Sequence, residues 1–147
     1  MKSVREHVVE IINKFYNTTL DLKTIQNNQF KQYNLNASDR NRVVVLSRDI
    51  LRWKGRLDLY IKEYLTHPID RLQSKLLVVL ELATYELIFD DKIPDYAAIN
   101  SAVDLAKRKF SKKAGGLVNA VLRKINSADT NEKPKLVKDS EWYSYPN

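Results

Sequence analysis

The chain has 147 residues and a net charge of +7, and 44% of its residues are hydrophobic, as in an ordinary water-soluble domain. It contains no cysteine, which excludes disulfides, thiolate metal sites and cysteine nucleophiles, and its two histidines, 60 residues apart, argue against a histidine-rich metal centre. The excess of 25 basic over 18 acidic residues favours a polyanionic partner.

Apolar residues recur at spacings of three and four along the first half of the chain. The spacing predicts a helix over residues 4–17, a weaker one over 22–33, and a third over 38–53 with Ser38 as its N-cap. Gly55 marks a junction before a fourth helix near residues 57–65, which the pair His67-Pro68 ends.

Residues 72–89 are apolar on nearly every side, which is typical of the central helix of a bundle. We therefore expect Leu80 and Ala83 at the centre of the core. Residues 75–80 alone also suit a buried strand, but the apolar pattern continues for too long to be one.

Two further helices are predicted after the loop at residues 90–94. Asp95 is expected to cap the first, whose apolar stripe runs from Ile99 to Phe110, and the second carries inward-facing residues from Leu117 to Ile125. The pair Gly115-Gly116 lacks side chains and lets two backbones approach closely there. Helical spacing throughout, with few glycines and prolines, predicts an all-α fold.

The character of the sequence changes after Ile125. Residues 126–138 are polar and lack periodicity, as in a linker, whereas Trp142, Tyr143 and Tyr145 make an aromatic end. We expect a domain over residues 1–126 and a tail over 127–147 that leads toward an absent catalytic domain.

No catalytic apparatus is evident in the sequence. The pair Asp90-Asp91 is typical of a solvated loop, and His7 and His67 are expected at the surface or in capping positions. The three glycines fit neither a dinucleotide-binding nor a phosphate-binding loop. We therefore expect no enzyme activity, no metal and no cofactor in this chain. Because no secretion signal or membrane-spanning run is present, the sequence also predicts a cytoplasmic location.

Basic residues concentrate in two stretches, the 107–124 cluster and the 40–56 cluster. The first holds seven basic residues and no acid, which suits phosphate contacts better than a solvated helix face. In the second, Asp39, Asp49 and Asp58 lie close enough in sequence to pair with the basic residues, so an ordinary solvated face is favoured there.

Several ordered motifs in the second half of the chain resemble the NusB family. They are YEL at residues 85–87, IP at 93–94, AINSAVDLAK at 98–107 and GLVNAVLRK at 116–124. The resemblance covers roughly residues 3–126. It implies an all-helical domain of about seven helices in two subdomains, which binds RNA without catalysis.

The family has two branches, and three features are similar to the N-terminal domain of the ribosomal RNA cytosine-C5 methyltransferases of the Sun or Fmu type. These are the segment from Leu51-Arg52 to Arg56-Leu57-Asp58, Arg123 where the antitermination factors commonly have Asp, and the end Tyr143–Asn147. The resemblance therefore favours a non-catalytic RNA-binding domain of such an enzyme. In that case S-adenosylmethionine is a cofactor only of a methyltransferase domain that follows.

Two alternatives stay open. One is a transcription antitermination factor that binds RNA together with ribosomal protein S10, and the other is a helical protein–protein adaptor. Because the arginine-rich start of the antitermination factors is reduced here to Lys2 and Arg5, the same grip on RNA is less well supported.

The resemblance implies that the partner is RNA, and the acid-free stretch at residues 107–124 indicates where RNA binds. We expect RNA phosphates to be bound by Lys107, Arg108, Lys112, Lys113, Arg123 and Lys124, helped by Lys2 and Arg5 from the first helix. Bases are expected to stack on Tyr85, Tyr96 or Phe110.

Overall fold

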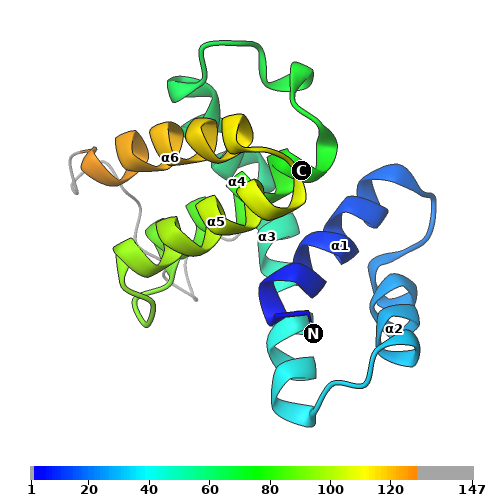
Figure 1. The fold of residues 1–147 in the computed structure, drawn as a ribbon. Coiled ribbons are helices and arrows are strands. Elements are labelled where there is room, and N and C mark those ends of the chain that lie inside the picture. The colour runs from blue at the N-terminus through cyan, green and yellow to red at the C-terminus, as the bar shows by residue number, and fades with distance from the viewer. Residues whose placement is uncertain (1, 129–147) are drawn as a thin grey trace. The chain divides into compact units, whose positions relative to one another are not determined.

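A computed structural model describes residues 2–128 of the chain. This part forms six α-helices and one 3-10 helix and contains no strand, so the all-α prediction is confirmed (Figure 1). The helices are α1 (Val4–Asn17), α2 (Leu22–Gln32), α3 (Ala37–Tyr64), η1 (Ile69–Arg71), α4 (Ser74–Phe89), α5 (Asp95–Lys109) and α6 (Lys112–Ser127). Because α6 continues to Ser127, the linker expected from residue 126 does not begin there. The aromatic end around Trp142 lies outside the described residues.

The third and fourth predicted helices are one continuous helix of 28 residues, α3, and the junction expected at Gly55 is wrong. A glycine inside a helix costs about 1 kcal/mol relative to alanine. That cost is small beside the burial of Trp53, Leu57 and Ile61, which hold this part of the helix in the core. Asn36 caps α3, because its Oδ1 accepts the backbone N–H of Asp39 at 2.8 Å, so the cap predicted at Ser38 is also wrong.

The chain divides into two compact units, Met1–Leu51 and Arg52–Asn147, with the boundary inside α3. In the first unit, α1 begins with a capping box in which Ser3 and Glu6 each bind the other's backbone N–H. Helix α2 packs on α1, and a buried hydrogen bond of 2.8 Å from Gln26 Nε2 to Ser47 Oγ joins α2 to α3.

Helix α4 is the buried helix of the second unit, as predicted, and packs against α5 and α6. Leu80 is 0% and Ala83 1% exposed, which confirms their place in the core and excludes the strand alternative for residues 75–80. A buried carboxylate of α4, Glu81, pairs with Lys54 of α3 at 3.1 Å, and Lys54 also binds Asp58 at 2.6 Å. Burial lowers the pKa of Lys54, but the two carboxylates outweigh this effect and hold it above its usual value.

The start of α5 differs from the prediction. Pro94 occupies the N-cap position, no side chain caps the helix, and Asp95 is its first residue. Asp95 still suits this place, because a negative charge in the first turn is favourable at the positive end of the helix dipole. Within residues 2–128, no helix has the length and hydropathy that crossing a membrane requires.

Candidate nucleic-acid interface

Helices α5 and α6 form a tight antiparallel hairpin, joined by Phe110 and Ser111 (Figure 1). Ser111 fixes the start of α6, since its Oγ accepts the backbone N–H of Ala114 at 3.0 Å. The connection therefore places the last turn of α5 beside the first turn of α6. Each of these turns is rich in basic residues.

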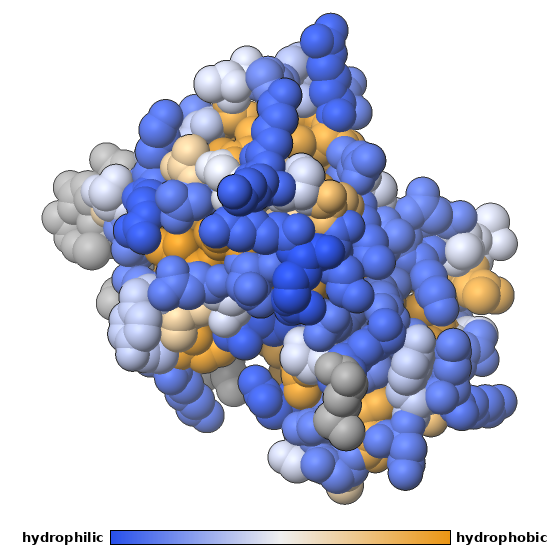
Figure 2. Space-filling model, in the orientation of Figure 1, coloured by the Kyte–Doolittle hydropathy of each residue, from blue (hydrophilic) through white to orange (hydrophobic). Residues whose placement is uncertain are grey.

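The closed end of this hairpin carries Lys107, Arg108 and Lys109 from α5 and Lys112 and Lys113 from α6, all of them exposed. Arg108 donates to Asp104 at 2.8 Å, but within residues 2–128 no ion pair joins Lys107, Lys112 or Lys113 to an acid. We call these three lysines the hairpin-end surface. Where Figure 1 draws α5 and α6, Figure 2 shows hydrophilic side chains with apolar surface between them.

The dipole of α6 adds to the positive charge at the hairpin end, whereas the dipole of α5 partly offsets it. Basic residues suit the last turn of α5, because the C-terminal end of a helix is negative. The first turn of α6 is already positive, yet it holds two lysines and no acid. The lysines and the backbone dipole thus raise the positive potential together, an arrangement that an anion such as a phosphate stabilises.

Arg123 and Lys124 lie elsewhere. Arg123 is eleven residues and Lys124 twelve residues along α6 from Lys112, which corresponds to about 16–18 Å of helix axis. Arg123 is held in place by a hydrogen bond of 3.0 Å from its Nε to Asn119 Oδ1. The 107–124 cluster of the sequence is therefore two groups of charges, one at each end of α6.

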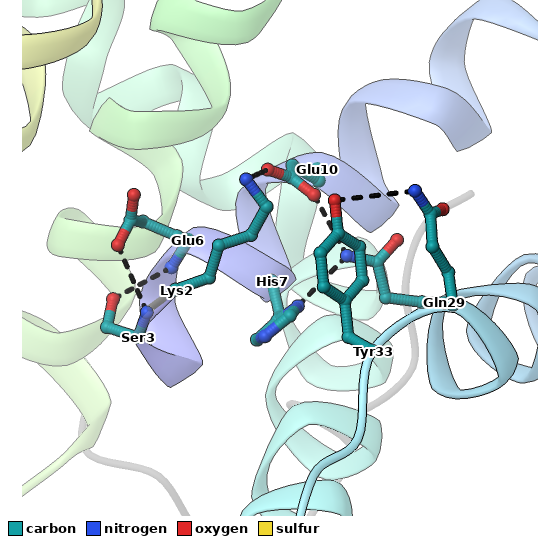
Figure 3. Close-up of polar contacts among 8 residues, drawn as sticks. Lys2, Ser3, Glu6, His7, Glu10, Gln29 and Tyr33 are labelled. Atoms are coloured by element: carbon teal, nitrogen blue, oxygen red, sulfur yellow. Dashed lines mark hydrogen bonds and ion pairs between the residues drawn. The ribbon is translucent and has the colours of Figure 1, made fainter.

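Lys2 and Arg5 belong to the first unit, on and before α1. The Lys2 ammonium binds Glu10 at 2.9 Å and lies 5.4 Å from the ring centroid of Tyr33 (Figure 3). The hydrogen bond and the charge of Glu10 raise the pKa of Lys2 above its usual value. Because a phosphate would compete with Glu10, Lys2 offers less to RNA than its charge suggests, and Arg5 is half-buried.

His7 belongs to the same polar cluster and corrects the expectation of a surface or capping residue. It is only 4% exposed, its Nδ1 lies 2.9 Å from Gln29 Nε2, and its ring meets Tyr33 edge-on (Figure 3). Gln29 Nε2 also donates to Glu10 at 2.9 Å. An amide that donates to Nδ1 requires the neutral imidazole, and burial lowers the pKa of His7. His67 is exposed, as expected.

The glycine pair of α6 makes one close contact. A Cβ atom on Gly115 would lie 2.5 Å from Cγ of Lys107, whereas a Cβ on Gly116 would have nothing within 4 Å. The expected close approach thus occurs at Gly115, but the neighbour is the side chain of a lysine and not a second backbone. The predicted partner, a second backbone, is therefore wrong.

The three residues proposed for base stacking lie in different surroundings. Tyr85 is 6% exposed and packs on Phe89, with ring centroids 5.4 Å apart, so its face is not available to a base. Tyr96 is 70% exposed, but it lies in the first turn of α5, eleven residues from Lys107. Phe110 is half-buried in the connection of the hairpin and is the aromatic residue next to the hairpin-end surface.

The 40–56 cluster is largely engaged within the protein. Arg40 lies 5.4 Å from the ring centroid of Phe30, Arg48 pairs with Asp49 at 3.4 Å, and Lys54 is held by its two carboxylates. These contacts agree with the expectation that this stretch is an ordinary helix face whose acids pair locally.

The chain matches known proteins along most of its length. The model of the NusB family matches residues 2–127. The chain is 33% identical over 112 residues to the transcription antitermination protein NusB of Acetivibrio thermocellus, covering 72% of this chain and 77% of the relative. The corresponding protein of Bacillus licheniformis is 33% identical over 110 residues, which cover 74% of this chain and 85% of the relative.

A second group of relatives is longer. The chain is 30% identical over 121 residues to a probable ribosomal RNA small subunit methyltransferase B of Synechocystis, covering 80% of this chain but only 27% of that protein. The chain belongs to the NusB family.

Proposed function

We propose that this protein binds RNA in transcription antitermination and that it contacts RNA phosphates through the hairpin-end surface. The observation that carries the proposal is the set of three exposed lysines, Lys107, Lys112 and Lys113, for which residues 2–128 supply no acidic partner. Phosphates are the polyanionic groups that three exposed lysines without an acidic partner suit, and the N-terminal end of α6 supports their binding. Ribosomal protein S10 is the protein partner that we propose.

The sequence motifs favour the methyltransferase branch, but the relatives support antitermination. The two antitermination proteins are each 33% identical to the chain, whereas the probable methyltransferase is 30% identical. Addition of the protein to a purified transcription reaction should raise read-through of a terminator. The variant Lys112→Glu/Lys113→Glu should lose that effect.

RNA binding itself is tested by titrating a labelled single-stranded RNA at several salt concentrations. If about four to six phosphates are neutralised, log K should fall against log salt with a slope of roughly −3 to −4. Lys112→Glu/Lys113→Glu should flatten the slope by about one to two units. As a matched control, Lys23→Glu/Lys31→Glu makes the same charge change on exposed lysines of α2 and should alter the slope much less.

Each contrary outcome has a clear meaning. If Lys112→Glu/Lys113→Glu keeps its circular dichroism spectrum and binds RNA with unchanged affinity and slope, the hairpin-end surface is not the site, and the 40–56 cluster replaces it. If the wild-type protein binds no RNA even at low salt, the proposal fails and the protein–protein adaptor remains.

A methyltransferase-associated RNA-binding domain is the second candidate, because the match to the Synechocystis protein extends over 121 residues. A reading frame that continues from Asn147 into a methyltransferase domain would favour it. In that case the protein should have no effect on terminator read-through, while RNA binding by the hairpin-end surface should persist.

A further inference from the structure

We infer that Gly115 is a positioning residue for RNA binding: its bare backbone forms a seat on α6 that holds the side chain of Lys107 in place at the hairpin end. This inference rests on the proposed function. It goes beyond that function because it distinguishes Lys107 from a freely moving surface lysine and assigns a role to a residue that cannot touch RNA through a side chain.

The seat is visible in the packing of α5 against α6. Gly115 is buried, and a Cβ atom built on it would lie 2.5 Å from Cγ, 3.2 Å from Cε and 3.4 Å from Cδ of Lys107. The aliphatic part of Lys107 therefore lies across the backbone of α6 at Gly115. Any larger residue at position 115 would occupy space that the lysine now fills.

The nature of the contacting atom makes the seat specific for glycine. Cγ is set by the first side-chain torsion of Lys107, so it cannot move away as the flexible end of a lysine can. A methyl group at position 115 would force Lys107 into another rotamer or push α5 and α6 apart. Either change moves the ammonium from the position that the packing of the stem on Gly115 gives it.

A seated lysine binds a phosphate better than a free one for an entropic reason. A surface lysine loses most of its rotamer freedom when it engages a ligand. Lys107 has given up part of that freedom on folding, because its stem packs on Gly115 while its side chain as a whole stays exposed. Lys107 therefore loses less rotamer entropy when it binds a phosphate, which is the usual advantage of preorganisation.

The chain supplies its own matched control in the neighbouring glycine. Gly116 lies in the same turn of α6, is exposed, and has nothing within 4 Å of the place of a Cβ. Gly115→Ala and Gly116→Ala therefore make the same chemical change one residue apart. Only the first meets Lys107.

The test is a double-mutant cycle of Gly115→Ala with Lys107→Ala, with RNA affinity as the readout. We expect Gly115→Ala to weaken binding about three- to tenfold and to flatten the salt slope by about 0.7, the share of one phosphate on a single strand. In the Lys107→Ala background, Gly115→Ala should have no further effect on affinity. Gly116→Ala should bind like the wild type.

Thermal unfolding gives a second readout that needs no RNA. With Lys107 present, Gly115→Ala should lower the midpoint because the new methyl group displaces the stem. With Lys107→Ala the methyl group has room, and the same change should raise the midpoint, since alanine favours the helix over glycine. If Gly115→Ala alone fails to fold, the double variant should still fold, and its affinity is compared with that of Lys107→Ala.

The outcomes separate this inference from the proposed function. If the wild type binds RNA and folded Gly115→Ala binds equally well with the same salt slope, the inference is overturned and the proposed function stands. The inference is also overturned if Gly115→Ala shifts the midpoint in the same direction in both backgrounds. If the wild type binds no RNA, the proposed function fails, and the role of the seat in RNA binding fails with it.

Discussion

Replacing Lys54 by Met should strongly destabilise the second unit. Glu81 is 0% exposed, and its carboxylate lies 3.1 Å from the Lys54 ammonium. Met keeps most of the aliphatic stem of the lysine but removes its charge, which lies beside this buried carboxylate. Removing one partner of a buried ion pair typically costs about 3–5 kcal/mol, because the other charge loses a compensating charge inside the protein.

The position of Lys54 places the expected value at the lower end of that range. The lysine side chain is 37% exposed, so water can partly replace it beside Glu81. Loss of the Lys54–Asp58 pair, four residues apart on α3, adds only about 0.3–0.5 kcal/mol. We therefore expect a loss of about 3 kcal/mol in the free energy of unfolding, which for a protein of this size lowers the midpoint by roughly 10 °C.

Urea unfolding at pH 7, followed by circular dichroism, measures the loss. Lys62→Met, an exposed lysine near the end of the same helix, is the control and should change stability by less than about 0.5 kcal/mol. The double variant Lys54→Met/Glu81→Leu should recover most of the loss, because neither charge is then buried. A cost below about 1 kcal/mol for Lys54→Met, the range of exposed pairs, would refute the placement of Glu81 in the core.

Three further changes test the core. Leu80→Ala should cost roughly 2–5 kcal/mol in urea unfolding, whereas Leu59→Ala, at a side chain that is 65% exposed, should cost less than about 0.5 kcal/mol. Thr84→Val should stabilise the protein by about 1 kcal/mol, because the buried Thr84 hydroxyl has no hydrogen-bond partner in the described part of the chain; a loss of stability would contradict this. The pKa of His7 is lowered in the folded state, so the unfolded chain binds more protons below about pH 6.5. The free energy of unfolding should therefore decrease as the pH is lowered from about 6.5 toward the folded pKa, by at most about 1.4 kcal/mol per pH unit. His7→Gln should remove this decrease, whereas His67→Gln should not.

Helical periodicity predicted most of the fold because it follows directly from which face of each helix is buried. It did not predict that α3 continues through Gly55, because the local preference of glycine is outweighed by packing that the sequence does not display. Local sequence also did not predict which residue caps α3. Asn36 and Ser38 have equivalent capping chemistry, and only the path of the chain decides which one begins the helix.

The candidate site was predicted less completely, because charges that are close in sequence need not be close in space. Arg123 follows Lys112 within one acid-free stretch, yet about 16 Å of the α6 axis separates the two. The burial of Tyr85 and His7 was open to prediction. Tyr85 lies in the helix predicted to be apolar all round, and His7 lies at helical spacing from Val4 and Ile11 on the buried stripe of α1.

The buried carboxylate of α4 also has a consequence for aggregation. The segment LLVVL at residues 76–80 combines high hydrophobicity with β-branched residues, and in an unfolded chain it is a candidate for intermolecular strand pairing. Lys75 and Glu81 flank it and act as charged gatekeepers until α4 is buried. Burying Glu81 costs desolvation free energy in the folded protein, but the same charge disfavours aggregation of the unfolded chain. We expect Lys54→Met/Glu81→Leu to be stable once folded but to lose yield when it is refolded from urea at high protein concentration.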